Sequence, residues 1–250
     1  MKFLQYLLIV LVAGYFVSSF SSCTPDDPEM IELGVNYYPL EVGKYRVFKV
    51  DSIIYDNVGN VIVRDTNSFY LKEELTDTLR DNQGNLVYTL ERFERSDPTG
   101  QWRVKDVYGV TMVDFQLHTI EENLRFIKLT FPISVDGSPW NGNTFIDEFT
   151  KVEIAGESIE IFKGWLYEYG EVDVPLEIQG LSFDSTLTVV QANEDNLIEF
   201  RYSTETYARG VGLIKKDMSI LNTQLLNSAD TWANKAEQGF ILKQEIIEYN

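Results

Sequence analysis

The alternation of apolar and polar residues, which runs through nearly the whole chain after residue 36, constrains the fold most strongly. Ile198, Phe200 and Tyr202 share one side of such a stretch. Glu199 and Arg201 occupy the other side. A period of two is that of a β-strand, and β-branched and aromatic residues dominate these stretches. The pattern predicts half-buried antiparallel strands.

Turn sequences separate the predicted strands. The pattern D-N-x-G-N occurs at 56–60 and 81–85, and 97–101 is a looser third copy. An Asp side chain caps such a turn, and Gly accepts the positive φ that closes it, so we predict successive hairpins. Calcium binding is the alternative, but these loops lack the alternating acids and closing glutamate of an EF-hand-like site. We therefore assign no metal.

The pattern predicts an all-β fold, in which an antiparallel, meander-like sheet curls into a barrel, half-barrel or sandwich. The predicted strands are 44–55, 61–75, 86–95, 101–108, 110–121, 124–135, 144–154, 158–169, 176–192, 196–208, 211–221 and 239–249. Two stretches interrupt the alternation, at 136–143 and 221–239. The second could hold a short helix or a structured loop.

The N-terminus has the pattern of an export signal. Lys2 precedes the apolar stretch 7–12, and small residues at 18–22 lead to Cys23, the only cysteine. An uncleaved membrane anchor is the alternative, because residues 3–20 would just reach across a bilayer.

The stretch Phe20-Ser21-Ser22-Cys23 resembles the end of a lipoprotein signal, although Phe20 replaces the usual leucine and Ser22 the usual glycine or alanine. The resemblance implies cleavage before Cys23 and acylation of its thiol, palmitate included. Acylation would anchor the protein to a membrane without a spanning segment.

A short acidic stretch follows Cys23. Asp26, Asp27 and Glu29 alternate with two prolines, which prevents a packed element. The stretch resembles the acidic export signal of surface-exposed Bacteroidota lipoproteins, and a plain solvated tether is the alternative.

We predict three parts: a signal peptide at 1–22, an acidic tether at 23–36 and a single β domain at 37–250. The net charge of −18 argues against a nucleic-acid partner. The expected partners are a membrane, through the lipid anchor, and either a protein or an apolar small molecule. Nothing in the sequence indicates a cofactor.

No residue is assigned a catalytic role. His118 is the only histidine and lies in a predicted strand, with no G-x-S-x-G motif in the chain. Acidic pairs occur at 73–74, 121–122 and 147–148, and a glycan hydrolase needs two acids about 5–9 Å apart. Sequence cannot supply that distance, so we expect these acids on the solvated surface.

The best binding candidates are aromatic residues in the interrupting stretches. Trp140 and Asn141 lie in a Gly- and Asn-rich loop, and Trp232 lies in the late segment. Aromatic loop residues stack on sugars or fill partner pockets. The alternative for each tryptophan is a plug at the end of the barrel.

Four segments, 37–45, 140–143, 207–214 and 239–242, look like those of uncharacterised Bacteroidota lipoproteins with an all-β domain. This resemblance implies a lipid-anchored outer-membrane protein on the periplasmic or cell-surface face, and it carries no known activity. We expect a non-catalytic binding or assembly role. The alternatives are a carboxylate-dependent glycan hydrolase and a structural or adhesive surface subunit.

Overall fold

The computed structural model describes residues 32–59, 61–226 and 229–250. The signal segment, Cys23 and the acids Asp26, Asp27 and Glu29 lie outside the described residues. The chain from Leu33 to Asn250 forms one unit. In the described part, no helix is long and apolar enough to cross a membrane.

The described residues of the unit from Leu33 onward form β-strands, with one short 3-10 turn and one short helix. The strands are β1 (Tyr45–Val58), β2 (Val61–Arg80), β3 (Leu86–Arg95), β4 (Arg103–Val113), β5 (Gln116–Glu121), β6 (Leu124–Thr130), β7 (Lys151–Ile154), β8 (Glu157–Glu160), β9 (Glu168–Ile178), β10 (Leu181–Asp195), β11 (Glu199–Ala208), β12 (Gly212–Asn222) and β13 (Gln238–Tyr249). The 3-10 turn η1 spans Val35–Tyr37, and the helix α2 spans Trp232–Lys235.

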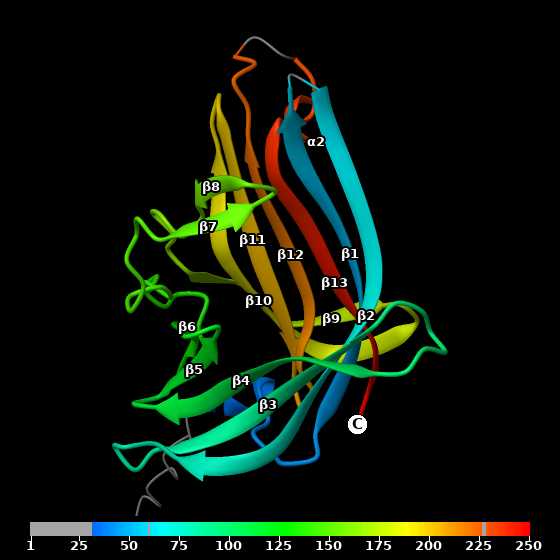
Figure 1. The fold of residues 1–250 in the computed structure, drawn as a ribbon. Coiled ribbons are helices and arrows are strands. Elements are labelled where there is room, and N and C mark those ends of the chain that lie inside the picture. The colour runs from blue at the N-terminus through cyan, green and yellow to red at the C-terminus, as the bar shows by residue number, and fades with distance from the viewer. Residues whose placement is uncertain (1–31, 60, 227–228) are drawn as a thin grey trace, which may run out of the picture. The chain divides into compact units, whose positions relative to one another are not determined.

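Eleven of these strands form one antiparallel sheet in the order β6-β5-β4-β3-β2-β1-β13-β12-β11-β10-β9. The first and last strands of the unit pair at its centre, and a meander extends on either side. The sheet curls into a half-barrel (Figure 1). The predicted all-β antiparallel meander is confirmed, and of the three predicted closures the half-barrel is the one found.

The predicted strand 158–169 is wrong, because β8 ends at Glu160 and β9 begins only at Glu168. The residues between them form a loop that buries Phe162, Trp165 and Tyr167. The apolar residues of this segment are spaced as in a strand, which explains the wrong prediction. In the structure they belong to a loop that places its aromatic rings in the core.

The predicted strand 176–192 is also wrong, because it spans a hairpin. Gln179 and Gly180 form the turn between β9 and β10, with φ angles of 52° and 79°. Similarly, Asp114 and Phe115 adopt positive φ and end β4 later than predicted. Neither of these two turns has the D-N-x-G-N pattern, and both were predicted as strand.

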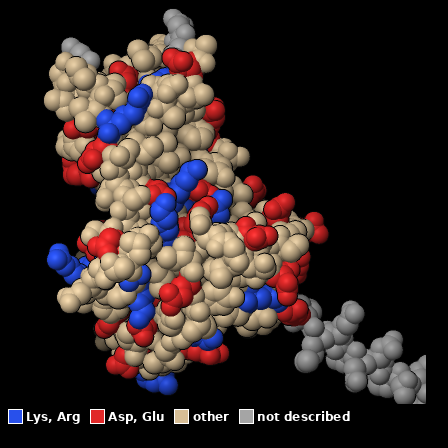
Figure 2. Space-filling model, turned by 90° about the vertical axis from the view of Figure 1, so that its right-hand side faces the viewer, with Lys and Arg blue, Asp and Glu red and all other residues tan. Residues whose placement is uncertain are grey.

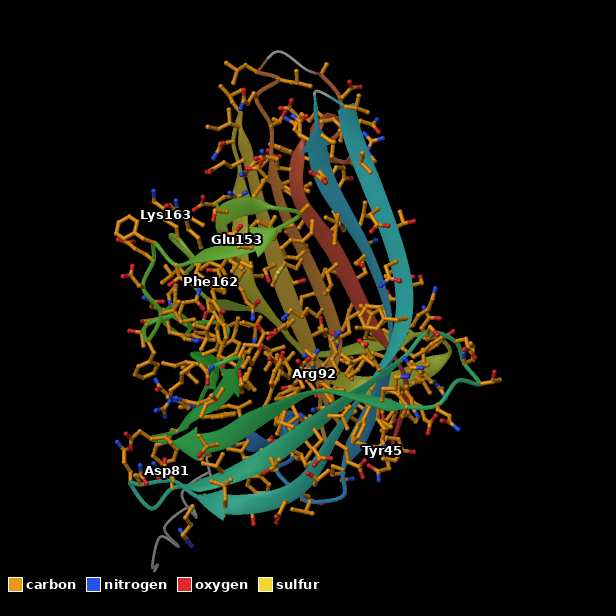
Figure 3. All side chains as sticks on the ribbon, viewed as in Figure 1. Tyr45, Asp81, Arg92, Glu153, Phe162 and Lys163 are labelled. Atoms are coloured by element: carbon orange, nitrogen blue, oxygen red, sulfur yellow. The ribbon has the colours of Figure 1, made fainter. Side chains whose placement is uncertain are left out.

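The predicted Asp caps are confirmed for the turns at 81–85 and 97–101. The Asp81 carboxylate accepts hydrogen bonds from the backbone N–H groups of Gln83 and Asn85, both at 2.9 Å, and Gly84 has φ of 86°. Figure 3 labels Asp81 at the tip of the β2–β3 hairpin. Asp97 likewise accepts from the Thr99 N–H at 3.0 Å.

The inner side of the curled sheet is filled by a large apolar cluster. Leu90, Leu117 and Leu187 come from both arms of the meander, and all are buried. The segment between β6 and β9 closes over this cluster, since Trp140 and Tyr167 pair through two backbone hydrogen bonds of 2.9 and 2.8 Å. The half-barrel is therefore packed with its own side chains.

Candidate functional site

A row of alternating charges crosses four neighbouring strands. Arg46, Glu73, Arg92 and Asp106 stand opposite one another in the register of β1, β2, β3 and β4. Glu73 accepts from Arg46 at 3.4 Å and from Arg92 at 3.2 Å. Arg92 also lies 3.1 Å from Asp106. Figure 3 labels Arg92 beside the densely packed interior of the sheet.

A second group of charges comes from the two outer arms of the sheet. Lys128 on β6 lies 3.1 Å from Glu121 of β5 and 3.0 Å from Glu205 of β11. Lys216 on β12 lies 3.2 Å from the same oxygen of Glu205. These ion pairs join β5–β6 to β11–β12 across the interior.

Two buried tyrosines connect the groups. The Tyr207 hydroxyl donates to Glu205 at 2.6 Å, and Arg46 donates to the Tyr38 hydroxyl at 3.0 Å. The rings of Tyr38 and Tyr207 are 6.2 Å apart. Members of both groups line one cavity, so we call the eight charged residues and two tyrosines the interior charge network.

The interior charge network is electrically balanced. Its cations are Arg46, Arg92, Lys128 and Lys216, and its anions are Glu73, Asp106, Glu121 and Glu205. Burial alone would raise the pKa of Glu205, but the ammonium groups of Lys128 and Lys216 lower it to about 2. Buried charges of this kind are retained only when they are paired.

The cavity inside the network is small. Its volume is about 60 Å³, which admits a few water molecules. Gln244 lines it, is 4% exposed, and has a side-chain N–H₂ group without a partner in the described part of the chain. A water molecule in the cavity would satisfy that donor.

The network contains two acids close together, which is what a glycan hydrolase requires. Glu121 and Glu205, however, both bind the same ammonium of Lys128. The ionised partners lower the pKa of both carboxyls, whereas a general acid needs a raised pKa. A cavity for a few waters also cannot hold a sugar ring. The arrangement favours electrostatic bracing of the sheet over acid–base chemistry.

The lowered pKa of Glu205 predicts a specific acid sensitivity. Because its folded pKa of about 2 lies below the ordinary value of 4.5, its stabilisation is present above pH 4.5 and is lost as pH falls toward 2. We expect Glu205→Gln to cost on the order of 3 kcal/mol near neutral pH and progressively less below pH 4.5. Urea unfolding of both proteins at several pH values checks this, and a difference that stays constant through acid would contradict it.

The structure places the predicted binding residues in separate regions. Trp140 is half-buried: its indole N–H donates to the Ile127 carbonyl at 3.0 Å, and its ring packs 4.8 Å from that of Tyr169. Asn141 is exposed and accepts from the Asn143 N–H at 2.9 Å. Their binding role stays a prediction.

Trp232 begins α2, so of the two alternatives for the late segment, a short helix or a structured loop, the short helix is found. Its ring stacks on Phe200 at 5.6 Å, its indole N–H donates to Asp195 at 2.7 Å, and Lys235 lies 3.8 Å over its face. Packing thus occupies much of this side chain, and a binding role for it also stays a prediction.

His118 lies in β5 and is 3% exposed. Its Nδ1 accepts from Arg125 at 2.8 Å, and its Nε2 lies 3.2 Å from Gln116. Burial, together with the Arg125 charge, lowers the pKa of His118 to about 4. The predicted strand position of His118 is confirmed, its side chain is packed, and the imidazole is neutral at physiological pH.

Sequence reasoning missed the interior charge network. Glu73 and Glu121 were expected on the solvated surface, but Glu73 is 6% exposed and Glu121 pairs with Lys128. The reason is cross-strand pairing, which brings together residues far apart in the chain. One available signal was that charges fall in phase with core residues, as Glu73 does with Leu71 and Leu75.

The β1–β2 turn, the β10–β11 turn and the segment after β12 lie at the same end of the sheet (Figure 1), and each carries exposed aliphatic residues. They are Val58, Val61, Leu197, Ile198, Leu225 and Leu226. Their exposed fractions run from 47% to 68%. A cavity of about 210 Å³ joins the three chain segments that carry them, lined by Asn57, Ile198 and Gln224 among others. We call these six residues the apolar tip.

The fold and site define an all-β antiparallel half-barrel that is braced by buried ion pairs. No model of a known protein family matches the sequence, and no curated protein matches it. A crystal structure of a protein from Parabacteroides distasonis, described as a "putative lipoprotein", is distantly similar, with a TM-score of 0.38 and 10% identity. The match covers 86% of this chain and 98% of that one.

Proposed function

We propose that this protein is a cell-envelope lipoprotein that binds a protein partner without catalysis. Acylation of Cys23 holds it at the outer membrane, and the stretch after Cys23 gives the β unit its reach. The observation that carries the binding role is the filled interior, which leaves the outer surface for recognition. A rigid scaffold presenting loops suits such a role.

The apolar tip is the surface we favour for this contact. Six exposed aliphatic residues on three adjacent loops exceed the scattered apolar residues of an ordinary surface. Glu199 and Glu237 border the cavity at its base. A protein partner with an apolar patch next to basic residues fits this surface. Figure 2, by contrast, shows acidic and basic side chains interspersed over much of one face.

A double substitution at the apolar tip tests the proposal. Ile198→Glu with Leu225→Glu places charges where the partner would bury apolar surface, and we expect at least a tenfold loss of association. In-cell cross-linking followed by purification of the full-length protein measures it. Val107→Glu is the matched control, because Val107 is equally apolar, 60% exposed and located on β4.

Wild type and Val107→Glu should yield the same cross-linked partner, and the tip variant should lose it. If a folded tip variant retains that partner, the partner binds a surface other than the apolar tip. If neither wild type nor control yields a partner, the proposal of a protein partner fails.

A further inference from the structure

A polar groove of about 470 Å³ lies where β2, β3 and β4 meet the β3–β4 turn. Its size falls in the range of small-molecule sites. The lining includes Asn67 and Ser68 from β2, Arg95 at the end of β3, and Gln101, Arg103 and Lys105 around the start of β4. It shares no residue with the interior charge network or the apolar tip.

Arg95 is held in place by aromatic rings. Its guanidinium carbon lies 4.2 Å from the centre of the Trp102 ring and 5.4 Å from that of Tyr70, its cross-strand partner. Stacking fixes the plane of a guanidinium and leaves its donor edge to bind an oxyanion through two hydrogen bonds.

The donors of Arg95 are not consumed by the protein. Its Nε is buried without a hydrogen-bond partner, and no ion pair of Arg95 occurs among residues 32–59, 61–226 and 229–250. A buried, unsatisfied charged donor requires an explanation such as a bound ion or ligand. Arg103 also lines the groove and is exposed, which adds a second positive charge.

The two carboxylates that line the groove already have partners, although Asp97 also lies within the field of Arg95. Glu94 pairs with Lys105 at 2.6 Å. Asp97 accepts from the backbone and hydroxyl of Thr99 at 3.0 and 2.8 Å. The groove therefore offers two arginines in a protein whose net charge is −18. Because the negative net charge of the protein repels anions, binding of an anion here would depend on these two arginines.

The other residues that line the groove indicate which kind of molecule bears the anionic group. Asn67 and Gln101 present amide groups, the Ser68 hydroxyl donates to Asp51 and keeps its acceptor lone pairs, and Phe69 is the one aromatic residue of the lining. Such a surface suits a hydroxyl-rich molecule better than an apolar one. We propose that this groove binds a sugar bearing an oxyanion, either a carboxylate or a phosphate, with Arg95 gripping the oxyanion.

Calorimetric titration of the full-length protein in detergent tests the site with four probes: glucuronate, glucose 6-phosphate, glucose and inorganic phosphate. We expect a millimolar dissociation constant for at least one charged sugar, and no binding of glucose at about 10 mM. Binding of glucuronate alone assigns a carboxylate, and binding of glucose 6-phosphate alone assigns a phosphate. Binding of both supports the shared oxyanion.

Arg95→Gln should weaken binding of the charged sugar at least tenfold. Arg103→Gln should weaken it several-fold without disturbing the stacked rings, so it keeps the test valid if Arg95→Gln fails to fold. Arg80→Gln, at the far end of β2, is the matched control and should bind like wild type. Unchanged affinity in folded Arg95→Gln, no binding of any charged sugar, or equally tight binding of inorganic phosphate would overturn the proposal.

Discussion

Replacing Lys128 with methionine should destabilise the unit by about 3 kcal/mol or more, because it leaves buried carboxylates without their shared cation. Lys128 is 7% exposed and Glu205 2% exposed, so only the few water molecules that the adjacent cavity admits can replace the lost ammonium. Lys216 and the Tyr207 hydroxyl still bind Glu205, which keeps the loss near the lower end of the usual range. Urea unfolding at neutral pH measures the change.

A double-mutant cycle separates the ion pair from the loss of packing. Glu205→Gln removes the charge that Lys128 neutralises, so Lys128→Met in that background should cost less than in wild type, by about 1–2 kcal/mol. Equal costs in both backgrounds would show that the ion pair does not couple the two arms of the sheet. Glu121 also binds Lys128 and loses this cation in the double variant, which limits how much stability the double variant regains.

Replacing Gly239 with alanine should cost about 3 kcal/mol or more, because two separate effects add at one position. Gly239 has φ of 110°, a conformation that residues with a Cβ rarely adopt. An added Cβ would also overlap the backbone carbonyl oxygen of Ile220. Gly239 pairs with Leu221 of β12 and Tyr55 of β1, so the clash falls between central strands of the sheet, close to the end where β13 begins.

Gly84→Ala is the control for Gly239→Ala. Gly84 has φ of 86°, but a Cβ there would meet nothing within 4 Å. Only the backbone strain applies, so we expect a loss of about 1–2 kcal/mol. Thermal unfolding of both variants gives the comparison. Equal losses of stability would mean that the backbone at Ile220 shifts to make room for the Cβ. This part of the sheet would then be more deformable than its packing indicates.

Local chemistry explains which parts of the fold could be predicted. The turn that contains Asp81 and Gly84 can be predicted from five consecutive residues, and strand β11 can be predicted from its own alternation of apolar and polar residues. The hairpin at Gln179 and the loop containing Trp165 carry no comparable local signal. Their form depends on packing against distant strands, which one sequence does not display.

The sites were harder to predict than the fold, because they depend on register. Glu205 is 77 residues from Lys128, and only the curl of the sheet brings them to 3.0 Å. Similarly, Arg95 meets Tyr70 through the β2–β3 pairing. Trp140 and Trp232, which stood out in the sequence, instead make extensive contacts with neighbouring residues.

Native mass spectrometry of the full-length protein, gently extracted from its own membrane, tests the lipid anchor and the protein partner together. We predict a chain that begins at Cys23, carries acyl mass there, and retains a protein partner. Cys23→Ser should lose the acyl mass and leave the membrane fraction, because the lipid anchor is gone. An uncleaved, unmodified leader would contradict the anchor. A wild-type protein that retains a small molecule and no protein would contradict the proposed partner.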